Sequence, residues 1–502
     1  MKPNFLAALV LFLSSYISLF SLDTIEDKFK NTVVQVKITT QAPNFLFPWQ
    51  PKKPQTYGAV GAVIANKRIL VFSSLIDYYT SIEVKKFSSY TAIPAKVIKI
   101  DYESNLTVLE VTDKDFFNDL VPVQFEAKID PFKPVSILQL DNSGSIQNSK
   151  GRLTGLDMES YPMGYTELPF VHLNSNEKLE GNGELILDKE KAVGMLYRFT
   201  ASKNSGKVIP SFVINSFIKQ KFEKTKGTIF PYKGFKFRPI HDLATKEYFG
   251  LDKKTDGVLI AEVIPYSSAD NHLQLNDIIL EYGGMKIDSQ GYFKHPIYGK
   301  QYLSFLAHSG EEFGFKMGSK IPVKILRNKK EEMLSMSLKA FPYKAVKIPY
   351  MNNEGKEPEY LVRGGFIFAE LSEFLMREFG SSWRSRIDKK LLYLNDYYRM
   401  NKKGETGRYV LLVQVLPDDS NNGYHSLSFD IVKSVNGVPV TSIRQLDSAF
   451  GNGESGIQES VSSKFVSLQT ENGTEIVLDK STLKEIDDRI QKKFGIEKLK
   501  NF

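Results

Sequence analysis

Six histidines and no cysteine limit the covalent chemistry that this chain of 502 residues could carry out. Without a thiol there is no cysteine nucleophile, no thiolate zinc site and no disulfide. The histidines stand at positions 172, 241, 272, 295, 308 and 425. No two of them have the helical i, i+4 spacing of a metal-binding pair, so we expect no metal site and no cofactor.

The remaining route to nucleophilic catalysis is a serine activated by a base. The first two hundred residues hold a single histidine, His172, in the apolar run FVHL, which predicts an ordinary strand position. A serine–lysine pair is the other route. Ser73, Ser74 or Ser175 with Lys178 would supply the residue types, but nothing in their spacing supports such a pair.

The elements that would position these residues are short runs rich in Val, Ile and Leu, separated by Gly, Asn, Asp and Pro. They are TVVQVKIT (32–39), AVGAVIA (59–65), RILVFSSLI (68–76), AKVIKI (95–100), LTVLEV (106–111), ELILD (184–188) and AVGMLY (192–197). Many short strands at this spacing predict an all-β sandwich or barrel. Residues 210–222 then change to a helical period and predict one closing amphipathic helix.

Two further units follow, from about 231 to 341 and from about 359 to 479. Both contain a strand ending in Pro, a strand–turn–strand with Gly, a helical stretch and a hairpin, which indicates two related domains. Asn436-Gly437 and Asn472-Gly473 predict tight hairpin turns. Residues 480–500 predict a charged amphipathic helix, and the acid pairs Asp418-Asp419 and Asp487-Asp488 are expected on solvated faces.

The first 21 residues are typical of a secretory signal. Lys2 supplies an early charge, Phe5–Phe20 is an apolar stretch, and Ser21 is a small residue at a cleavage position. An uncleaved anchor is the alternative, although the stretch is short for a spanning helix. We expect an exported chain, periplasmic or secreted, with no membrane span after cleavage. The net charge of +8 is spread along the chain and does not predict nucleic-acid binding.

Several segments together resemble the HtrA/Deg family of trypsin-like proteases with PDZ domains. They are GAVGAVI (58–64), RILVFSSLID (68–77), IDYESNLTVLEV (100–111), FVHLNSNEKLEGNGELILDKEKAVGMLY (170–197) and GKVIPSFVINSFI (206–218). The third unit is similar to the divergent second PDZ domain of Deg proteases, through YLVRGGFIFAELSEFL (360–375), YVLLVQVLPDDSNNGYHSL (409–427) and IVKSVNGVPVTSIRQLDSAF (431–450).

The resemblance implies a mainly β chain: a trypsin-like double β-barrel followed by two PDZ-like α+β domains. Its implied divisions are a signal peptide at 1–21, a protease-like domain at 22–225, a first PDZ domain at 229–341 and a second, divergent one with a C-terminal helix at 355–500.

Carried over residue by residue, the family's catalytic triad falls on Ser74 at the histidine position, Asn105 at the aspartate position and Asn182 at the serine position. None of these side chains can act as base, charged orienting group or strong nucleophile in its place. Glu180 and Glu184 stand where the family has Gly, beside the expected oxyanion site, and negative charge there opposes an oxyanion. Gly181-Asn182-Gly183 is also typical of a plain turn.

The same resemblance implies peptide-binding loops in both PDZ units. In the first they are Gly234, Phe235, Lys236 and Phe237, and in the second Gly364, Gly365, Phe366 and Ile367. The alternatives are that the first loop belongs to a closed core, and that the insert 374–407 covers the second groove and serves domain contact.

We interpret the chain as an exported pseudoprotease that acts as a scaffold or chaperone-like envelope protein. Its expected partners are protein C-termini or unfolded segments, and a homo-oligomer is one form that it could take. One alternative is an active serine endopeptidase in protein quality control. The other is a structural component of envelope assembly.

Overall fold

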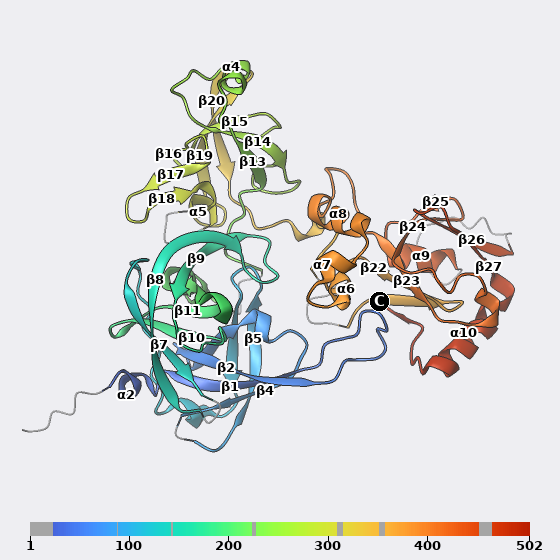
Figure 1. The fold of residues 1–502 in the computed structure, drawn as a ribbon, viewed down its shortest axis with the longest axis horizontal. Helices are drawn as coiled ribbons and strands as arrows, with labels where there is room; N and C mark the ends of the chain where they lie inside the picture. Colours follow the sequence, from blue (N-terminus) through green and yellow to red (C-terminus); the bar gives the residue numbers. More distant parts are fainter. Residues whose placement is uncertain are drawn as a thin grey trace, which may run out of the picture.

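The computed structural model describes residues 24–87, 89–141, 144–222, 227–308, 315–350, 357–450 and 464–502. The predicted signal peptide, residues 1–21, lies outside these ranges. Strands dominate the described chain, which confirms the mainly β prediction. Figure 1 shows paired barrels in blue and green, a middle domain above them and a C-terminal domain in orange and red beside them.

The first barrel forms from apolar strands, and in β2, β3 and β6 most side chains are buried. Its strands are β1 (Val33–Thr40), β2 (Gln55–Ile64), β3 (Arg68–Phe72), β4 (Tyr79–Lys85), β5 (Ile93–Asp101) and β6 (Leu106–Val111), after a short helix α2 (Ile25–Phe29). They close in the order β1-β2-β3-β6-β5-β4. The loop between β1 and β2 runs from the barrel to the C-terminal domain (Figure 1).

The second barrel closes in the order β10-β11-β12-β9-β8-β7. Its strands are β7 (Pro134–Leu140), β8 (Ile146–Ser160), β9 (Glu167–Asn174), β10 (Glu184–Asp188), β11 (Lys191–Thr200) and β12 (Ser205–Pro210). Helix α3 (Ser211–Ile218) follows β12 directly and confirms the predicted closing helix. Its buried residues include Phe212, Val213 and Phe217.

The middle domain is a sheet in the order β13-β14-β15-β19-β20, with a separate hairpin packed beside it. The sheet strands are β13 (Phe235–Pro239), β14 (Val258–Val263), β15 (Ile278–Tyr282), β19 (Lys320–Arg327) and β20 (Lys330–Ser337), with β16 (Met285–Lys286) beside β15. The hairpin is β17 (Tyr292–His295) and β18 (Gly299–Tyr302), and the helices are α4 (Leu243–Phe249) and α5 (Leu303–His308).

The C-terminal domain has a sheet in the order β27-β26-β24-β23-β22-β21-β28. Its strands are β21 (Tyr360–Arg363), β22 (Phe366–Glu370), β23 (Val410–Val415), β24 (Asp430–Val435), β25 (Val438–Pro439), β26 (Phe465–Thr470), β27 (Glu475–Asp479) and β28 (Lys500–Asn501). Its helices are α6 (Glu373–Met376), α7 (Trp383–Arg386), α8 (Lys389–Tyr397), α9 (Ile443–Ala449) and α10 (Lys480–Phe494). Asn436 and Gly437, both at positive φ, join β24 to β25 and confirm the predicted turn.

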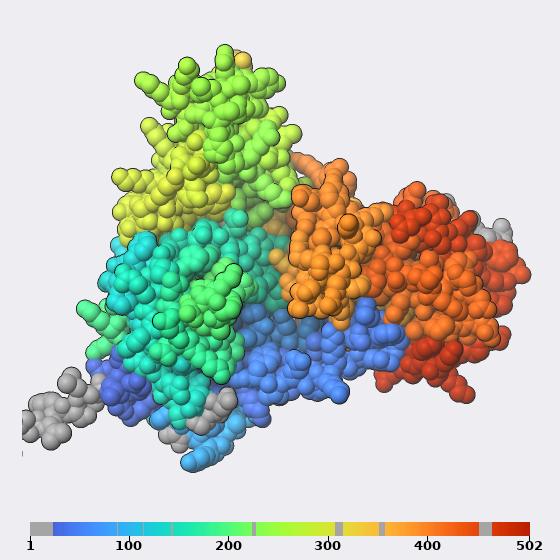
Figure 2. All heavy atoms as spheres, viewed as in Figure 1, coloured from blue at the N-terminus to red at the C-terminus, as the bar shows by residue number. Residues whose placement is uncertain are grey.

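One apolar core continues from the second barrel into the middle domain. The Phe212 ring of α3, fully buried, lies 6.0 Å from the ring of Tyr298 and 6.4 Å from that of Phe305. Residues of both domains belong to the same buried cluster. Figure 2 shows the middle domain in contact with the barrel. The interface is therefore a packed core rather than a hinge.

Replacing Phe212 by Ala should lower the free energy of unfolding by about 3–5 kcal/mol, because a buried aromatic ring is lost at this shared core. Chemical denaturation of the full chain measures the change. Phe132→Ala is the matched control, since that ring is 59% exposed, and it should change stability by less than about 0.5 kcal/mol. Equal effects of both substitutions would contradict the shared core.

Candidate functional site

Ser74 and Asn105 meet at the end of the first barrel. Ser74 lies in the 3₁₀ turn that follows β3, and Asn105 lies in the β5–β6 turn with φ of 55°. The Ser74 backbone N–H donates to Asn105 Oδ1 at 2.8 Å, and the Ser73 N–H donates to the Asn105 carbonyl at 3.0 Å. Two of the three sequence-predicted positions are thus in direct contact.

This contact fixes the polarity of the Asn105 amide. Because Oδ1 accepts from the Ser74 backbone, Nδ2 is the free end of the side chain, and it is buried without a hydrogen-bond partner. A catalytic imidazole needs an acceptor at this point to hold its Nδ1–H. Asn105 would present a donor there, so even a histidine at position 74 would be held in the wrong tautomer.

Asn182 lies in the loop before β10 and contacts the first barrel through β2. Its Nδ2 donates to the Gly58 carbonyl at 3.3 Å, and its own carbonyl accepts from the Val60 N–H at 3.0 Å. The neighbouring Tyr57 hydroxyl donates to the carbonyl of Leu75, the residue after Ser74. Adjacent residues of one strand therefore contact both the Asn182 loop and the Ser74 turn.

The Glu184 carboxylate occupies the backbone donors of the Asn182 loop. Its oxygens accept the N–H groups of Glu180 at 2.8 Å, Gly181 at 2.9 Å and Asn182 at 2.7 Å. Glu184 is only 2% exposed. In a protease, such convergent N–H groups bind the oxyanion of the reacting carbonyl. Here these N–H groups bind the chain's own carboxylate.

Glycine is required on both sides of Asn182. Gly181 has φ of +80° and Gly183 of +110°, and a Cβ on Gly183 would lie 2.3 Å from the Val60 carbonyl oxygen. These conformations and close approaches exclude other residues. The loop is also beside a cavity of about 260 Å³ between the barrels, lined in part by Gly58, Asn182 and Glu184.

A second buried carboxylate, Glu103, lies two residues before Asn105. Its Oε2 accepts the backbone N–H groups of Tyr165 at 2.9 Å and Thr166 at 2.6 Å, and its Oε1 accepts the Tyr343 hydroxyl at 2.5 Å. Glu103 therefore joins the first barrel, the second barrel and the segment after the middle domain. Burial raises the pKa of Glu103 to about 7.

The same turn also holds the segment that leads into the middle domain. The Thr228 hydroxyl donates to Asp101 Oδ2 at 3.1 Å, and Lys99 donates to the Gly227 carbonyl at 2.8 Å. Burial raises the pKa of Asp101 as well. Residues 99–105 thus bind both connecting segments at once.

An aromatic cluster surrounds the Glu103 contact and extends it to the C-terminal domain. The Tyr165 ring stacks on Phe341 with centroids 4.4 Å apart, and its hydroxyl accepts the Tyr350 N–H at 3.0 Å. The Arg399 guanidinium lies 5.4 Å from the Tyr165 ring and 4.0 Å from the Tyr350 ring. Arg399 also pairs with Glu373 at 2.9 Å, within the C-terminal domain.

Two points about the barrel site remain: the position of His172 and whether any side chains could bind a metal ion. The His172 side chain is 44% exposed on β9 and lies 3.9 Å from Asp157. Among the described residues no group of three or more His, Asp or Glu side chains could hold a metal ion. No helix in the described part of the chain is long and apolar enough to cross a membrane.

The predicted peptide loop of the middle domain is tied to the barrel. Gly234, at φ of +85°, has no room for a Cβ, which would lie 2.0 Å from Ser267 Oγ. The preceding Lys233 is buried and bonds Glu167 of β9 and Ser304 of α5, each at 3.0 Å. Beyond it, Phe235 is fully buried, as the closed-core alternative expects.

The remaining two residues of that loop lie on β13, the edge strand of its sheet, where Lys236 is exposed and Phe237 packs partly buried against the core. Lys236 pairs with Glu262 at 2.8 Å, and the Phe237 ring lies 5.4 Å from the Tyr302 ring. Strand addition at β13 would have to accommodate this aromatic contact.

In the C-terminal domain the corresponding residues form a turn that is already filled. Gly364 and Gly365 join β21 to β22, and Phe366 and Ile367 begin β22, which pairs with β21 on one side and β23 on the other. The Gly364 N–H donates to Asp487 at 2.8 Å. Strand addition to β22 is therefore not available, and the geometry favours the domain-contact alternative.

Asp487 was expected on a solvated face, and this prediction is wrong. The side chain lies on the buried face of α10, where it accepts the Gly364 N–H and pairs with Arg363 at 2.9 Å. Burial raises the pKa of Asp487. The resemblance implies that the Gly364 N–H would bind the carboxylate of a peptide. As in the Asn182 loop, it binds a carboxylate of the chain itself.

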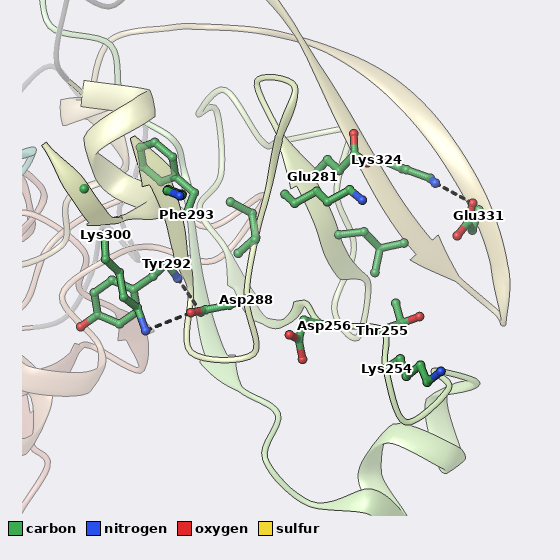
Figure 3. Close-up of a pocket in the computed structure, with 15 residues that line it drawn as sticks. Lys254, Thr255, Asp256, Glu281, Asp288, Tyr292, Phe293, Lys300, Lys324 and Glu331 are labelled. Atoms are coloured by element: carbon green, nitrogen blue, oxygen red, sulfur yellow. Dashed lines mark hydrogen bonds and ion pairs between the residues drawn. The ribbon is translucent and has the colours of Figure 1, made fainter. Parts of the chain in front are cut away.

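The middle domain carries a mixed-charge hollow of about 710 Å³. Figure 3 shows its charged side chains converging from the β17–β18 hairpin and the sheet, with Lys300 bonded to Asp288 and Lys324 to Glu331. Lysines and carboxylates line it in nearly equal number. This balance does not suit a polyanion.

Two closed β-barrels followed by two sheet domains have the arrangement of a trypsin-like double β-barrel followed by PDZ-like domains. A family model described as "PDZ domain" matches residues 348–500. The chain is 25% identical over 424 residues to "Protease Do-like 2, chloroplastic" of Arabidopsis thaliana, covering 83% of this chain and 67% of the relative. It is 25% identical over 458 residues to "Protease Do-like 4, mitochondrial" of the same plant, covering 91% and 82%.

A solved structure titled "HtrA-type protease AlgW with decapeptide" matches 64% of this chain and 99% of its own, at 15% identity and a TM-score of 0.48. The similarity to relatives named as Do-like proteases and the match to a PDZ domain model support the resemblance to the HtrA/Deg family. The fold class predicted from the sequence is confirmed.

Removing the Glu184 carboxylate should destabilise the Asn182 loop. Glu184→Ala leaves backbone donors buried without a partner, so we expect a loss of about 2–3 kcal/mol in the free energy of unfolding. Urea denaturation measures this loss. Glu180→Ala is the matched control, because that side chain is exposed, and it should leave stability nearly unchanged; equal losses would contradict the assigned role.

The Glu103 carboxyl should make stability fall as pH rises. Its folded pKa of about 7 exceeds the usual value of 4.5, so between these pH values the folded chain keeps a proton that the unfolded chain has released. Stability is therefore full below about pH 4.5 and is lost up to about pH 7, by roughly 3 kcal/mol. The buried Asp101 contributes with the same sign.

Urea denaturation at pH 5 and pH 8 checks this expectation. Glu103→Gln keeps the shape of the side chain without its titration and should flatten the pH dependence. If wild type and variant change in parallel between these pH values, Glu103 is not the group responsible.

Proposed function

We propose that this chain is a catalytically inactive HtrA/Deg homologue that acts as a binding scaffold or chaperone-like protein. The observation that carries the proposal is the Glu184 carboxylate bonded to three N–H groups of the Asn182 loop. A reacting carbonyl could not use donors already held by a buried anion. Ser74, Asn105 and Asn182 support the same conclusion, because none can pass a proton or attack an amide.

The proposal includes the domain boundaries given above, export to the periplasm or outside the cell, and assembly as a homo-oligomer. Its partners would be protein C-termini or unfolded segments. The rigid seating of the middle domain and the filled turn of the C-terminal domain also support a structural role in envelope assembly. The names of the relatives favour the other candidate, an active serine endopeptidase.

Incubating the purified chain with unfolded casein and a fluorophosphonate probe tests the two candidates. We expect neither casein fragments nor labelled serine. A serine within residues 32–222 that takes up the probe, and whose replacement by Ala abolishes casein cleavage, would establish the endopeptidase instead.

Restoring the triad should not restore activity while Glu184 remains. We expect the triple variant Ser74→His, Asn105→Asp, Asn182→Ser to stay inactive, because Glu184 still holds the oxyanion donors. Adding Glu184→Gly should raise casein cleavage by roughly a hundredfold over the triple variant, the effect of one oxyanion donor or more. Circular dichroism verifies the fold of each variant, and an active triple variant would show that Glu184 does not block the site.

A further inference from the structure

An aromatic segment of the first barrel is seated in the C-terminal domain. Residues 44–49, here called the hook, lie in the β1–β2 loop, and Figure 2 shows this blue loop against the orange and red domain. Phe45 is buried in a core cluster of that domain, with its ring 6.1 Å from Phe374 of α6. The Trp49 ring lies 6.0 Å from that of Tyr360 on β21.

The C-terminal domain also binds the main chain of the hook. Gln414 Nε2 donates to the Leu46 carbonyl at 2.9 Å, and Glu378 Oε1 accepts the Phe45 N–H at 3.4 Å. The same carboxylate pairs with Lys52 at 2.8 Å. Main-chain hydrogen bonds combined with side-chain pockets are how domains bind extended peptides.

The hook is shaped as a ligand before it docks. Asn44 Oδ1 accepts the N–H groups of Leu46 at 3.0 Å and Phe47 at 3.3 Å, which closes a turn within the segment. Asn side chains stabilise turns in this way without help from a second domain. The contacts that belong to the C-terminal domain are therefore those of Tyr360, Phe374, Glu378 and Gln414.

The hook does not fill its seat completely. A cavity of about 460 Å³ remains between the hook and the domain, lined in part by Pro48, Trp49, Tyr360 and Lys498. The Trp49 indole N–H is buried there without a hydrogen-bond partner. A buried donor left unpaired weakens an interface, so the Trp49 indole makes the hook a weaker ligand for this seat than a segment without an unpaired donor.

We propose that this face of the C-terminal domain is a receptor for extended aromatic segments of other polypeptides, and that the hook is its resident ligand. The partner is an exposed run of aromatic and aliphatic side chains followed by a cation, as in Phe45–Trp49 and Lys52. The inference rests on the proposed binding function and names the segment that the scaffold takes. It places the receptor away from the β22 edge, which β21 covers.

The probe is a fluorescent peptide with the sequence of residues 43–53, added to full-length chains. Phe45→Ala with Trp49→Ala should empty the seat and raise peptide affinity at least tenfold over wild type. Adding Gln414→Ala and Glu378→Gln to this double variant should lower its peptide affinity at least fivefold. Phe132→Ala, an exposed ring on the barrel, is the control and should match wild type.

Fluorescence anisotropy measures these affinities, and thermal melting verifies that each variant is folded. A folded double variant that binds the peptide no better than wild type would overturn the proposal. If wild type and the double variant form a mixed dimer, the hook of a second copy occupies the emptied seat. This result would also overturn the proposal.

A second measurement uses only the wild-type chain, so it does not depend on the stability of the variants. Excess peptide should raise amide hydrogen exchange over residues 43–50 and leave 373–379 protected, because one ligand replaces the other. Unchanged exchange at saturating peptide would contradict displacement. The casein assay on the same samples separates the two failures, since cleavage would refute the inactive scaffold and absent peptide binding would refute only the receptor.

Discussion

Buried carboxylates that accept backbone N–H groups hold this molecule together. Glu184 binds three such groups in the nucleophile loop, Glu103 binds two in the second barrel, and Asp487 binds one in the Gly364 turn. Convergent N–H groups favour an anion, and in two of these places the family would put a reacting oxyanion or a peptide carboxylate. In each place the chain supplies the anion itself, which stabilises the loop.

The Glu103 contacts explain why the domains have fixed positions. A single turn, residues 99–105, bonds the connecting segments on both sides of the middle domain. The Tyr165 cluster and Arg399 extend these bonds to the C-terminal domain. With Phe212 in a core shared by two domains, and the hook in another, rigid connections replace the flexible linkers that separate domains in many chains.

The sequence predicted the strands because they depend on local residue types. Val, Ile and Leu runs give the barrels, and Ser74 and Asn105 meet because their strands, β3 and β6, are neighbours in a closed sheet. The signal at Glu184 was visible as an acid in place of glycine, and it was interpreted as repulsive. Its actual role depends on the backbone direction of the loop, which residue types do not reveal.

Other features could not be predicted from the sequence for a related reason. Asp487 sits in a charged helix and Glu103 in a polar turn, where charge normally indicates solvent. The hook's aromatic residues indicated burial but not the domain that buries them, more than three hundred residues away. Strand β21 covers the edge of β22 because the two strands form a hairpin. Gly364 and Gly365 set the direction of that hairpin.

The most direct test of the account is amide hydrogen exchange in the peptide that spans residues 179–184 of the wild-type chain. If Glu184 holds the N–H groups of Glu180, Gly181 and Asn182, they should exchange as slowly as the strands of the barrel core, and Glu184→Gln should speed them. Exchange at the rate of an exposed turn, unaltered by that substitution, would mean that the donors face the cleft and remain available to a substrate.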